Sequence, residues 1–331
     1  MKIAVLGAGA WGSALASALS ATVHHVTLWG REAEVMADLN ATHINTRFLP
    51  EIELNHALQY SNDLHATLDA HNAPDDVLII ATPIAGLRET AHKIATHTTR
   101  AAVLWLCKGV ERDTLQFPHQ VVGGILHPHT PFGVLSGPSF AQEVARDLPC
   151  ALVLASEFAQ LDLAFVQTLS SQNLRIYHST DVIGVELGGA HKNVLAIAAG
   201  ISDGLQLGMN ARAALLTRGI AEMRRFASAL GANADTISGL AGVGDLILTA
   251  TGDLSRNRTV GLQLAQGQTL GEISANLGHV AEGALCANAM LQIANAHSIK
   301  APITQGVCAI LDGVPARVVL EQLLLREAVR E

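Results

Sequence analysis

A single lysine, Lys192, interrupts an otherwise nearly apolar segment between residues 185 and 200. If this segment is a helix, Gly188 and Gly189 share the face of the lysine and leave room for another group beside it. Two adjacent glycines destabilise a helix by about 1 kcal/mol each, which indicates a packing or ligand requirement. A lysine whose pKa falls from about 10.4 toward the working pH can donate a proton to a forming alkoxide. Alternatively, Lys192 extends its amine outward from a crowded contact between helices.

Asp245 ends a glycine-rich turn in the segment GLAGVGDL and leads into an apolar run. A buried carboxylate needs a cationic partner, and Lys192 is the natural one. An aspartate here can also cap the start of a helix, and both roles can hold at once. The residues therefore predict a buried pair of Lys192 with Asp245.

Cations that could bind an anion occur at two further places. Ser255-Arg256-Asn257 stands at a predicted helix start, where backbone N–H groups point outward and an arginine offers a planar fork to a phosphate. Lys108 follows a predicted strand at the carboxyl edge of the sheet, where α/β folds bind ligands. Both could instead be solvated surface residues. A chain of net charge −8 needs such a local cluster to hold a phosphorylated substrate.

The segment SGPSFA, residues 136–141, also follows a predicted strand. Glycine and proline fix the shape of this loop, and Ser139 can donate a hydrogen bond to a phosphate or a hydroxyl. A plain turn explains the same residues equally well.

Gly7, Gly9 and Gly12 form a G-x-G-x-x-G pattern directly after a predicted strand and at the start of a predicted helix. In that setting the first glycine permits a tight turn, the second lets the backbone approach a pyrophosphate, and the third lets the helix pack on its strand. The pattern predicts a dinucleotide site.

Arg31 stands at the end of the next predicted strand, where an NAD-preferring fold usually carries an acidic residue for the ribose. An arginine there can accommodate a 2′-phosphate, which favours NADPH and leaves NADH open. The alternative is a surface arginine paired with Glu34.

Two halves with different patterns flank residue 180. The first half alternates short β-rich runs with helical stretches, which predicts a Rossmann-like, doubly wound, mostly parallel sheet over residues 1–180. The second half, residues 181–331, has long helical patterns and no strand pattern, which predicts an all-α substrate domain. The expected strands are 2–6, 25–29, 77–81, 103–106, 132–135, 150–155 and 174–177, and the expected helices are 12–20, 33–40, 86–96, 157–170, 183–199, 211–230, 258–266, 284–297 and 316–326.

The composition restricts the class of protein. Of 331 residues, 49% are hydrophobic and 15% are charged, which excludes a disordered chain. The negative net charge argues against nucleic acid and anionic membranes as partners. The four cysteines form no C-x-x-C pair, the histidines form no metal-binding pattern, and no apolar run reaches about 18 residues. We expect a cytoplasmic protein with no metal and no stable membrane insertion.

Together these segments resemble the bacterial type of NAD(P)-dependent glycerol-3-phosphate dehydrogenase over essentially the whole chain. The stretch from Gly189 to Asn210 is similar to the family's G-A-L-K-N…G…D-G…G-x-N signature. SGPSFA, GLAGVGDL and SRNR are similar to family motifs in order and spacing.

The resemblance implies roles for individual residues. Lys192 would be the general acid/base, and Asp245 would hold Lys192 and a substrate hydroxyl. The remaining implied contacts form three sets. The substrate set adds Lys108, Gly137, Ser139, Ser255, Arg256 and Asn257, and Asn193 would either contact the substrate or support the residues that do. The cofactor set adds Ala10, Trp11, Arg31, Ala141, Val280 and Glu282 to the glycines, and Lys108 and Arg256 would reach both ligands.

The resemblance implies reduction of dihydroxyacetone phosphate to sn-glycerol 3-phosphate by NADP(H) or NAD(H), which would feed phospholipid synthesis. The alanine-rich second half offers a surface for a homodimer. Two alternatives stay open: a β-hydroxyacid or ketopantoate reductase of the same plan, and a non-catalytic NADPH-binding sensor.

Two residues depart from the family pattern. His191 replaces the usual apolar residue before Lys192, and Cys107 precedes Lys108 where a small hydroxyl residue is more usual. His191 could perturb the pKa of Lys192. A His191→Leu variant with an unchanged pH–rate profile would contradict that hypothesis.

Overall fold

A computed structural model describes residues 1–22, 24–97, 100–277 and 282–324 of the chain, without the side chains of residues 276, 277, 282 and 324. Contacts between Cα atoms divide the chain into two compact units. The first unit consists of Met1–Lys108 and Gln116–Val185, and the second of Gly109–Leu115 and Glu186–Glu331.

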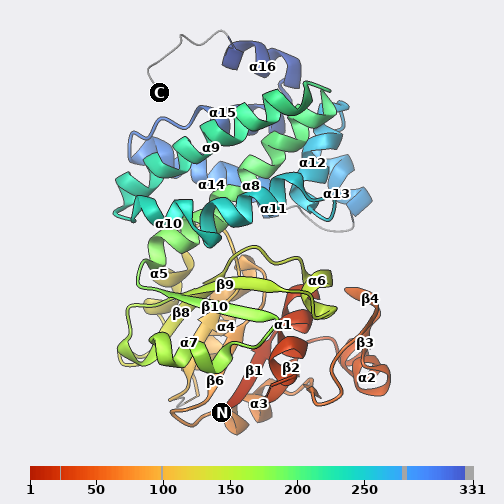
Figure 1. Cartoon of the computed structure of the whole chain (residues 1–331), viewed down its shortest axis with the longest axis vertical. Helices are drawn as coiled ribbons and strands as arrows, with labels where there is room; N and C mark the ends of the chain where they lie inside the picture. Colours follow the sequence, from red (N-terminus) through yellow and green to blue (C-terminus); the bar gives the residue numbers. More distant parts are fainter. Residues whose placement is uncertain (23, 98–99, 278–281, 325–331) are drawn as a thin grey trace. The chain divides into compact units, whose positions relative to one another are not determined.

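The first unit is built on an eight-stranded sheet with the strand order β10-β9-β8-β7-β6-β1-β2-β5 (Figure 1). Neighbouring strands are parallel except β8 and β9, which are antiparallel. The strands are β1 Lys2–Leu6, β2 His25–Trp29, β5 Gln59–Ser61, β6 Val77–Ile80, β7 Ala102–Trp105, β8 Phe132–Ser136, β9 Cys150–Ala155 and β10 Leu174–Ser179. This order confirms the predicted mostly parallel sheet.

Apolar runs explain the central strands. The side chains of β6 and of most of β1 and β7 are buried, as expected for parallel strands covered on both faces. Leu6 aligns with Trp29 on one side and with Ile80 on the other, so the strands end at a common edge. The chain leaves β1 toward β2 and later returns to the other side of β1 as β6, and ligands bind at such a switch point in α/β sheets.

Helices and one small hairpin complete the first unit. The helix α6 packs against α1, and α7 packs against β10. The helices are α1 Ala10–Ser20, α2 Ala33–Thr42, α3 Leu64–Ala70, α4 Ile84–Ala95, α5 Pro118–Gly123, α6 Ala141–Ala145 and α7 Leu163–Leu169, and the hairpin consists of β3 Ile44–Asn45 and β4 Leu49–Glu53.

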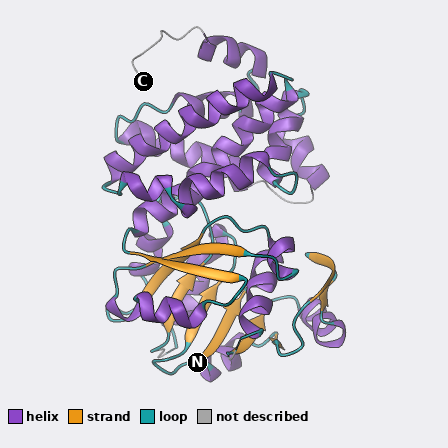
Figure 2. Cartoon of the chain, viewed as in Figure 1, coloured by secondary structure: helices purple, strands orange, loops and turns teal. Residues whose placement is uncertain are grey.

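Among its described residues, the second unit contains helices and no strand, as Figure 2 shows, and this confirms the predicted all-α half. Its longest helices are α8 Val182–Gly204, which begins in the last residues of the first unit, and α9 Gly208–Leu230. The others are α10 Ala234–Ser238, a π-helical turn Leu240–Gly244, α11 Asp245–Thr251, α12 Arg256–Ala265, α13 Leu270–Leu277, α14 Glu282–Ala296, α15 Pro302–Leu311 and α16 Ala316–Leu324.

Some expected elements need correction. The single helix expected over 157–170 is a short 3₁₀ turn, Ala159–Leu161, followed by α7, because the Asp162 carboxylate accepts a hydrogen bond from the backbone N–H of Phe165 at 3.0 Å and caps a new helix start. The short strands β3, β4 and β5 were not predicted.

Within the described ranges, no helix is both long enough and apolar enough to cross a membrane.

Candidate active site

Lys192 and Asp245 form a buried ion pair in the second unit. The Nζ atom of Lys192 lies 2.5 Å from Oδ1 of Asp245 and donates a second hydrogen bond to Oγ1 of Thr249 at 2.9 Å. Lys192 is 8% exposed and Asp245 is 1% exposed. Such a pair survives burial only because charge and hydrogen bonding are both matched. The structure therefore brings the two predicted catalytic residues together.

The glycines of α8 explain how Asp245 approaches the lysine. A Cβ atom at Gly188 would collide with the backbone of Ala241 and Gly242 in the π-helical turn. The space beside Lys192 is thus filled by the protein's own turn, which delivers Asp245 to the first position of α11. This turn explains the packing requirement at Gly188.

The N-terminus of α12 contacts α8 one residue beyond the lysine. The side-chain amide of Asn257 donates to Oδ1 of Asn193 at 2.9 Å. Ser255 is the N-cap of α12, and its buried hydroxyl accepts from the backbone N–H of Arg258 at 3.2 Å. Arg256 is exposed at the first position of this helix. The helix start therefore places the Asn257 amide against Asn193, with the exposed Arg256 one residue before it, and a helix N-terminus of this kind can bind an anion.

Gly283 helps to position Asn257. Gly283 is the second residue of α14. A Cβ atom there would collide with the side-chain oxygen of Asn257, so the missing side chain leaves room for that amide.

His191 points away from the lysine into a separate buried cluster. Its Nε2 atom lies 2.9 Å from Oγ1 of Thr304 and 3.3 Å from Oε1 of Glu222. Burial alone would raise the pKa of the Glu222 carboxyl, but hydrogen bonds from His191, Thr304 and the backbone of Ile303, with the charge of His191, outweigh burial and hold that pKa below its usual value. This cluster joins α8 to α9 and α15.

In the first unit, the predicted substrate residues of two loops meet at the sheet edge. Lys108 Nζ donates to the carbonyl oxygen of Gly137 at 3.1 Å, and Ser139 Oγ donates to the same oxygen at 3.0 Å. Gly137 has a φ of +143°, and a Cβ atom there would lie 2.9 Å from the carbonyl oxygen of Ala151. Only glycine fits this conformation comfortably, so Gly137 fixes the path of the loop.

The three glycines after β1 have different surroundings. Gly7 has a φ of +136°, and a Cβ atom there would lie 2.8 Å from the backbone of Ala81. A Cβ atom at Gly12 would collide with the carbonyl oxygen of Gly7, whereas one at Gly9 would meet no heavy atom within 4 Å. The open space at Gly9 beside the N-terminus of α1 fits a pyrophosphate, because that helix end offers N–H groups. The buried hydroxyl of Thr82, without a partner among the described residues, adds a hydrogen-bonding group near this loop.

The other predicted cofactor residues lie in several places. Ala10, Trp11 and Ala141 are partly buried against the core of the first unit. Arg31 is exposed, with Nη2 3.5 Å from the carboxylate of Glu32 and not paired with Glu34. Val280 lies outside the described residues, as does the side chain of Glu282, whose backbone begins α14.

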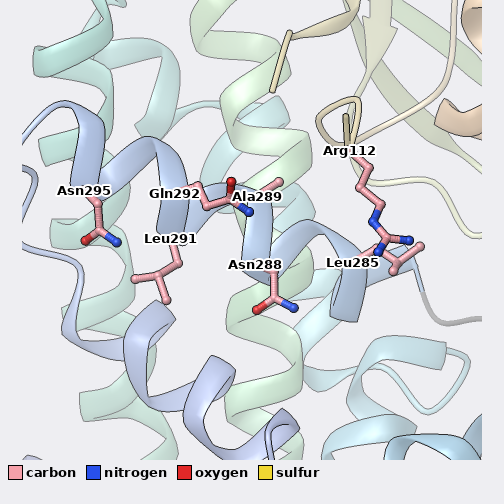
Figure 3. A pocket seen from close by; sticks show the side chains of 7 residues that line it. All are labelled: Arg112, Leu285, Asn288, Ala289, Leu291, Gln292 and Asn295. Atoms are coloured by element: carbon pink, nitrogen blue, oxygen red, sulfur yellow. The ribbon is translucent and has the colours of Figure 1, made fainter. Parts of the chain in front are cut away.

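One hollow of the second unit, of about 290 Å³, contains none of the predicted residues (Figure 3). Arg112 and the exposed face of α14 line it, with the amides of Asn288, Gln292 and Asn295. Its residues share no hydrogen bond with the Lys192 cluster in the described part of the chain.

Known proteins are similar to this chain in sequence and in fold. Residues 2–162 match the family described as NAD-dependent glycerol-3-phosphate dehydrogenase N-terminus, and residues 181–319 match its C-terminus. The chain belongs to the NAD-dependent glycerol-3-phosphate dehydrogenase family. This membership makes it an NAD(P)-dependent oxidoreductase and confirms the resemblance inferred from the motifs.

Individual relatives cover the whole chain. A protein of Burkholderia orbicola (strain MC0-3) named glycerol-3-phosphate dehydrogenase [NAD(P)+] is 56% identical over 99% of both chains. A protein of the same name from Ralstonia nicotianae is 50% identical over 100% of this chain and 99% of its own. The crystal structure of glycerol-3-phosphate dehydrogenase from Coxiella burnetii superposes with a TM-score of 0.92 at 38% identity, covering 98% of this chain and 99% of that one.

Sequence reasoning missed Thr249, which contacts both charged groups of the buried pair. Its hydroxyl accepts from Lys192 Nζ at 2.9 Å and lies 3.4 Å from Oδ1 of Asp245, and it donates to the Asp245 backbone carbonyl at 2.7 Å. The available signal was its spacing, because residues four apart on a helix share a face.

Proposed function

We propose that this chain reduces dihydroxyacetone phosphate to sn-glycerol 3-phosphate with NADPH or NADH, and that Lys192 is the general acid/base. The observation that carries this proposal is the buried contact of Lys192 with Asp245 and Thr249. Family membership supports the reaction class. In the cytoplasm, the product would supply phospholipid synthesis with glycerol phosphate. A homodimer also stays a prediction.

The two units would divide the work. The first, predicted as residues 1–180, would bind the dinucleotide through the loop of Gly7, Gly9 and Gly12 and through Arg31. The second, predicted as residues 181–331, would bind the substrate through Asn193, Ser255, Arg256 and Asn257. Lys108, Gly137 and Ser139 of the first unit stay predicted substrate residues. The helix N-terminus with Arg256 suits a dianionic phosphate.

The proton step would occur at the substrate carbonyl oxygen. The loop of Gly7, Gly9 and Gly12 would hold NAD(P)H, which when bound would supply a hydride for the carbonyl carbon. Lys192, in its ammonium form, would give one proton to the resulting alkoxide, so that a hydroxyl forms and a neutral amine remains until solvent returns a proton. Asp245 and Thr249 would orient Nζ toward that oxygen and match the ammonium charge.

NADPH consumption, followed by absorbance, tests the reaction. The substrates are dihydroxyacetone phosphate, unphosphorylated dihydroxyacetone and ketopantoate. We expect turnover with the phosphate alone at low concentration, because the helix start of α12 would supply most of the binding. Faster turnover of ketopantoate would instead favour the alternative function, a ketopantoate reductase. NADPH binding without turnover of any substrate would favour the sensor.

A further inference from the structure

Asp203, near the end of α8, accepts hydrogen bonds from two arginines on two other helices. Arg258 of α12 donates to its Oδ2 atom from Nε at 3.0 Å and from Nη2 at 2.8 Å. Arg212 of α9 donates to the same oxygen from Nη1 at 2.9 Å. The three side chains are only 15–16% exposed. At that depth, charged hydrogen bonds are screened less by water than at the surface.

These bonds give the two arginines of the SRNR segment, Arg256 and Arg258, different roles. Arg258 is bound to Asp203 and also donates to Asp253 at 3.1 Å, so two carboxylates surround it. An incoming phosphate would be repelled by both carboxylates, which makes Arg258 a poor anion ligand. Arg256, two residues earlier, is exposed at the helix start. Arg258 therefore serves the protein's own packing.

The backbones of α8 and α12 lie against each other at this point. A Cβ atom at Gly200 would collide with the carbonyl oxygen of Arg258, and one at Gly261 would collide with that of Ile197. These glycines let the two helices approach closely. Two polar contacts join the same helices on either side of that approach, namely Asp203 with Arg258 and Asn193 with Asn257, and each adds a directional bond that fixes α12 along α8.

We propose that Asp203, with Arg212 and Arg258, is a positioning network that holds the first turn of α12 in register with Lys192 and thereby sets the affinity for the substrate's phosphate group. The inference rests on the proposed function. Asp203 would touch neither ligand. It acts through Arg256 and Asn257 of α12, whose position against α8 depends on the register of the two helices.

Asp203→Asn tests the network, and Asp253→Asn is its matched control. Both variants remove one negative charge that contacts Arg258, but the Asp253 side chain is 98% exposed. We expect Asp203→Asn to raise KM for dihydroxyacetone phosphate about tenfold, as the loss of a charged hydrogen bond would. It should change kcat much less, and leave the Kd of NADPH and the rate with unphosphorylated dihydroxyacetone unchanged. Asp253→Asn should behave as wild type.

The outcomes separate the possible failures. Equal losses with the phosphorylated and the unphosphorylated substrate would show a merely structural role and overturn the inference, as would an unchanged KM in the folded Asp203→Asn variant. If that variant does not fold, Asp203→Glu retains the charge and moves the carboxylate, and an unchanged KM there contradicts the inference equally. Wild-type protein that does not turn over dihydroxyacetone phosphate would instead reject the proposed function.

Discussion

Three consecutive residues of α8, His191, Lys192 and Asn193, contact three separate groups of residues. Because successive residues of a helix are rotated by about 100°, His191 meets Glu222 and Thr304, Lys192 meets Asp245, and Asn193 meets Asn257. The hypothesis that His191 perturbs the pKa of Lys192 stays untested, but the structure gives His191 a carboxylate of its own.

The open space at Gly9 gives a prediction about cofactor binding. Gly9→Ala adds a methyl group where no protein atom lies within 4 Å, so the fold should tolerate it. A bound pyrophosphate would meet that methyl group, and a clash of about 1–3 kcal/mol raises the Kd of NADPH about 10- to 100-fold. Gly12→Ala should instead lower the melting temperature, because its methyl group collides with Gly7. Fluorescence titration and thermal unfolding measure both, and unchanged NADPH binding by Gly9→Ala would contradict the assignment of the loop.

The exposed Arg31 predicts a difference between the two cofactors. Its contact with Glu32, with both side chains exposed, contributes little to stability. Arg31→Ala should therefore leave the fold intact and remove a charged hydrogen bond to the 2′-phosphate, which raises the Kd of NADPH about tenfold. NADH lacks that phosphate, so its Kd should not change. Equal weakening of both cofactors would assign Arg31 a role other than recognition of the 2′-phosphate.

At the scale of elements, the crossing of α8 and α12 depends on glycines. Gly200→Ala would force the two backbones apart and should destabilise the protein by at least about 1–3 kcal/mol. The matched control is Gly271→Ala in α13, where a Cβ atom would find its nearest neighbour, the Thr269 hydroxyl, at 3.9 Å. That change should be neutral or stabilise by about 0.5–1 kcal/mol. Urea unfolding compares them, and equal stability of the two variants would contradict the close crossing.

The buried carboxylate that joins α8, α9 and α15 predicts a pH dependence. The Glu222 carboxylate lies beside His191 of α8 and accepts hydrogen bonds from Thr304 and the Ile303 N–H of α15. Arg225, on the same helix as Glu222, has its Nη2 atom 3.9 Å from the carboxylate. Because its folded pKa lies below the usual value of 4.5, its charged form stabilises the fold fully above pH 4.5 and loses this effect as the pH falls below it.

Glu222→Gln removes that charge and should destabilise the protein by about 1–3 kcal/mol near neutral pH. The difference in unfolding free energy between wild type and variant should shrink as the pH falls below 4.5. Urea unfolding at a series of pH values measures it. A difference that grows in acid would mean that the folded pKa of Glu222 is raised.

Sequence patterns predicted the long helices and central strands but not the short elements. The central strands and the long helices α8, α9 and α14 were predicted because apolar runs and helical periods extend over many residues. The hairpin of β3 and β4 is too short to show a period, and the π-helical turn that delivers Asp245 has no periodic signal. The Lys192–Asp245 contact was predictable because a buried charge requires a partner. The contact of Asp203 with Arg258, 55 residues away, was not predicted because both residues can also be solvated.

At the scale of the whole molecule, the two compact units do not follow a single division of the chain. The loop Gly109–Leu115 belongs to the second unit although both flanking segments belong to the first. A seven-residue loop carries no hydrophobic period that could predict this grouping. The chain carries a negative net charge and as a whole repels anions. The proposed binding of an anionic substrate therefore depends on a few local cationic and N–H groups.

Replacement of Lys192 tests the central claim most directly. Lys192→Arg keeps the charge beside Asp245 but cannot release a proton in the working pH range. We expect kcat with dihydroxyacetone phosphate to fall about 100- to 10,000-fold, while the Kd of NADPH and the folded structure stay unchanged. Lys300→Ala, an exposed lysine of the same unit, is the control and should retain full activity. Near-wild-type turnover by Lys192→Arg would contradict the assignment of Lys192 as the general acid/base.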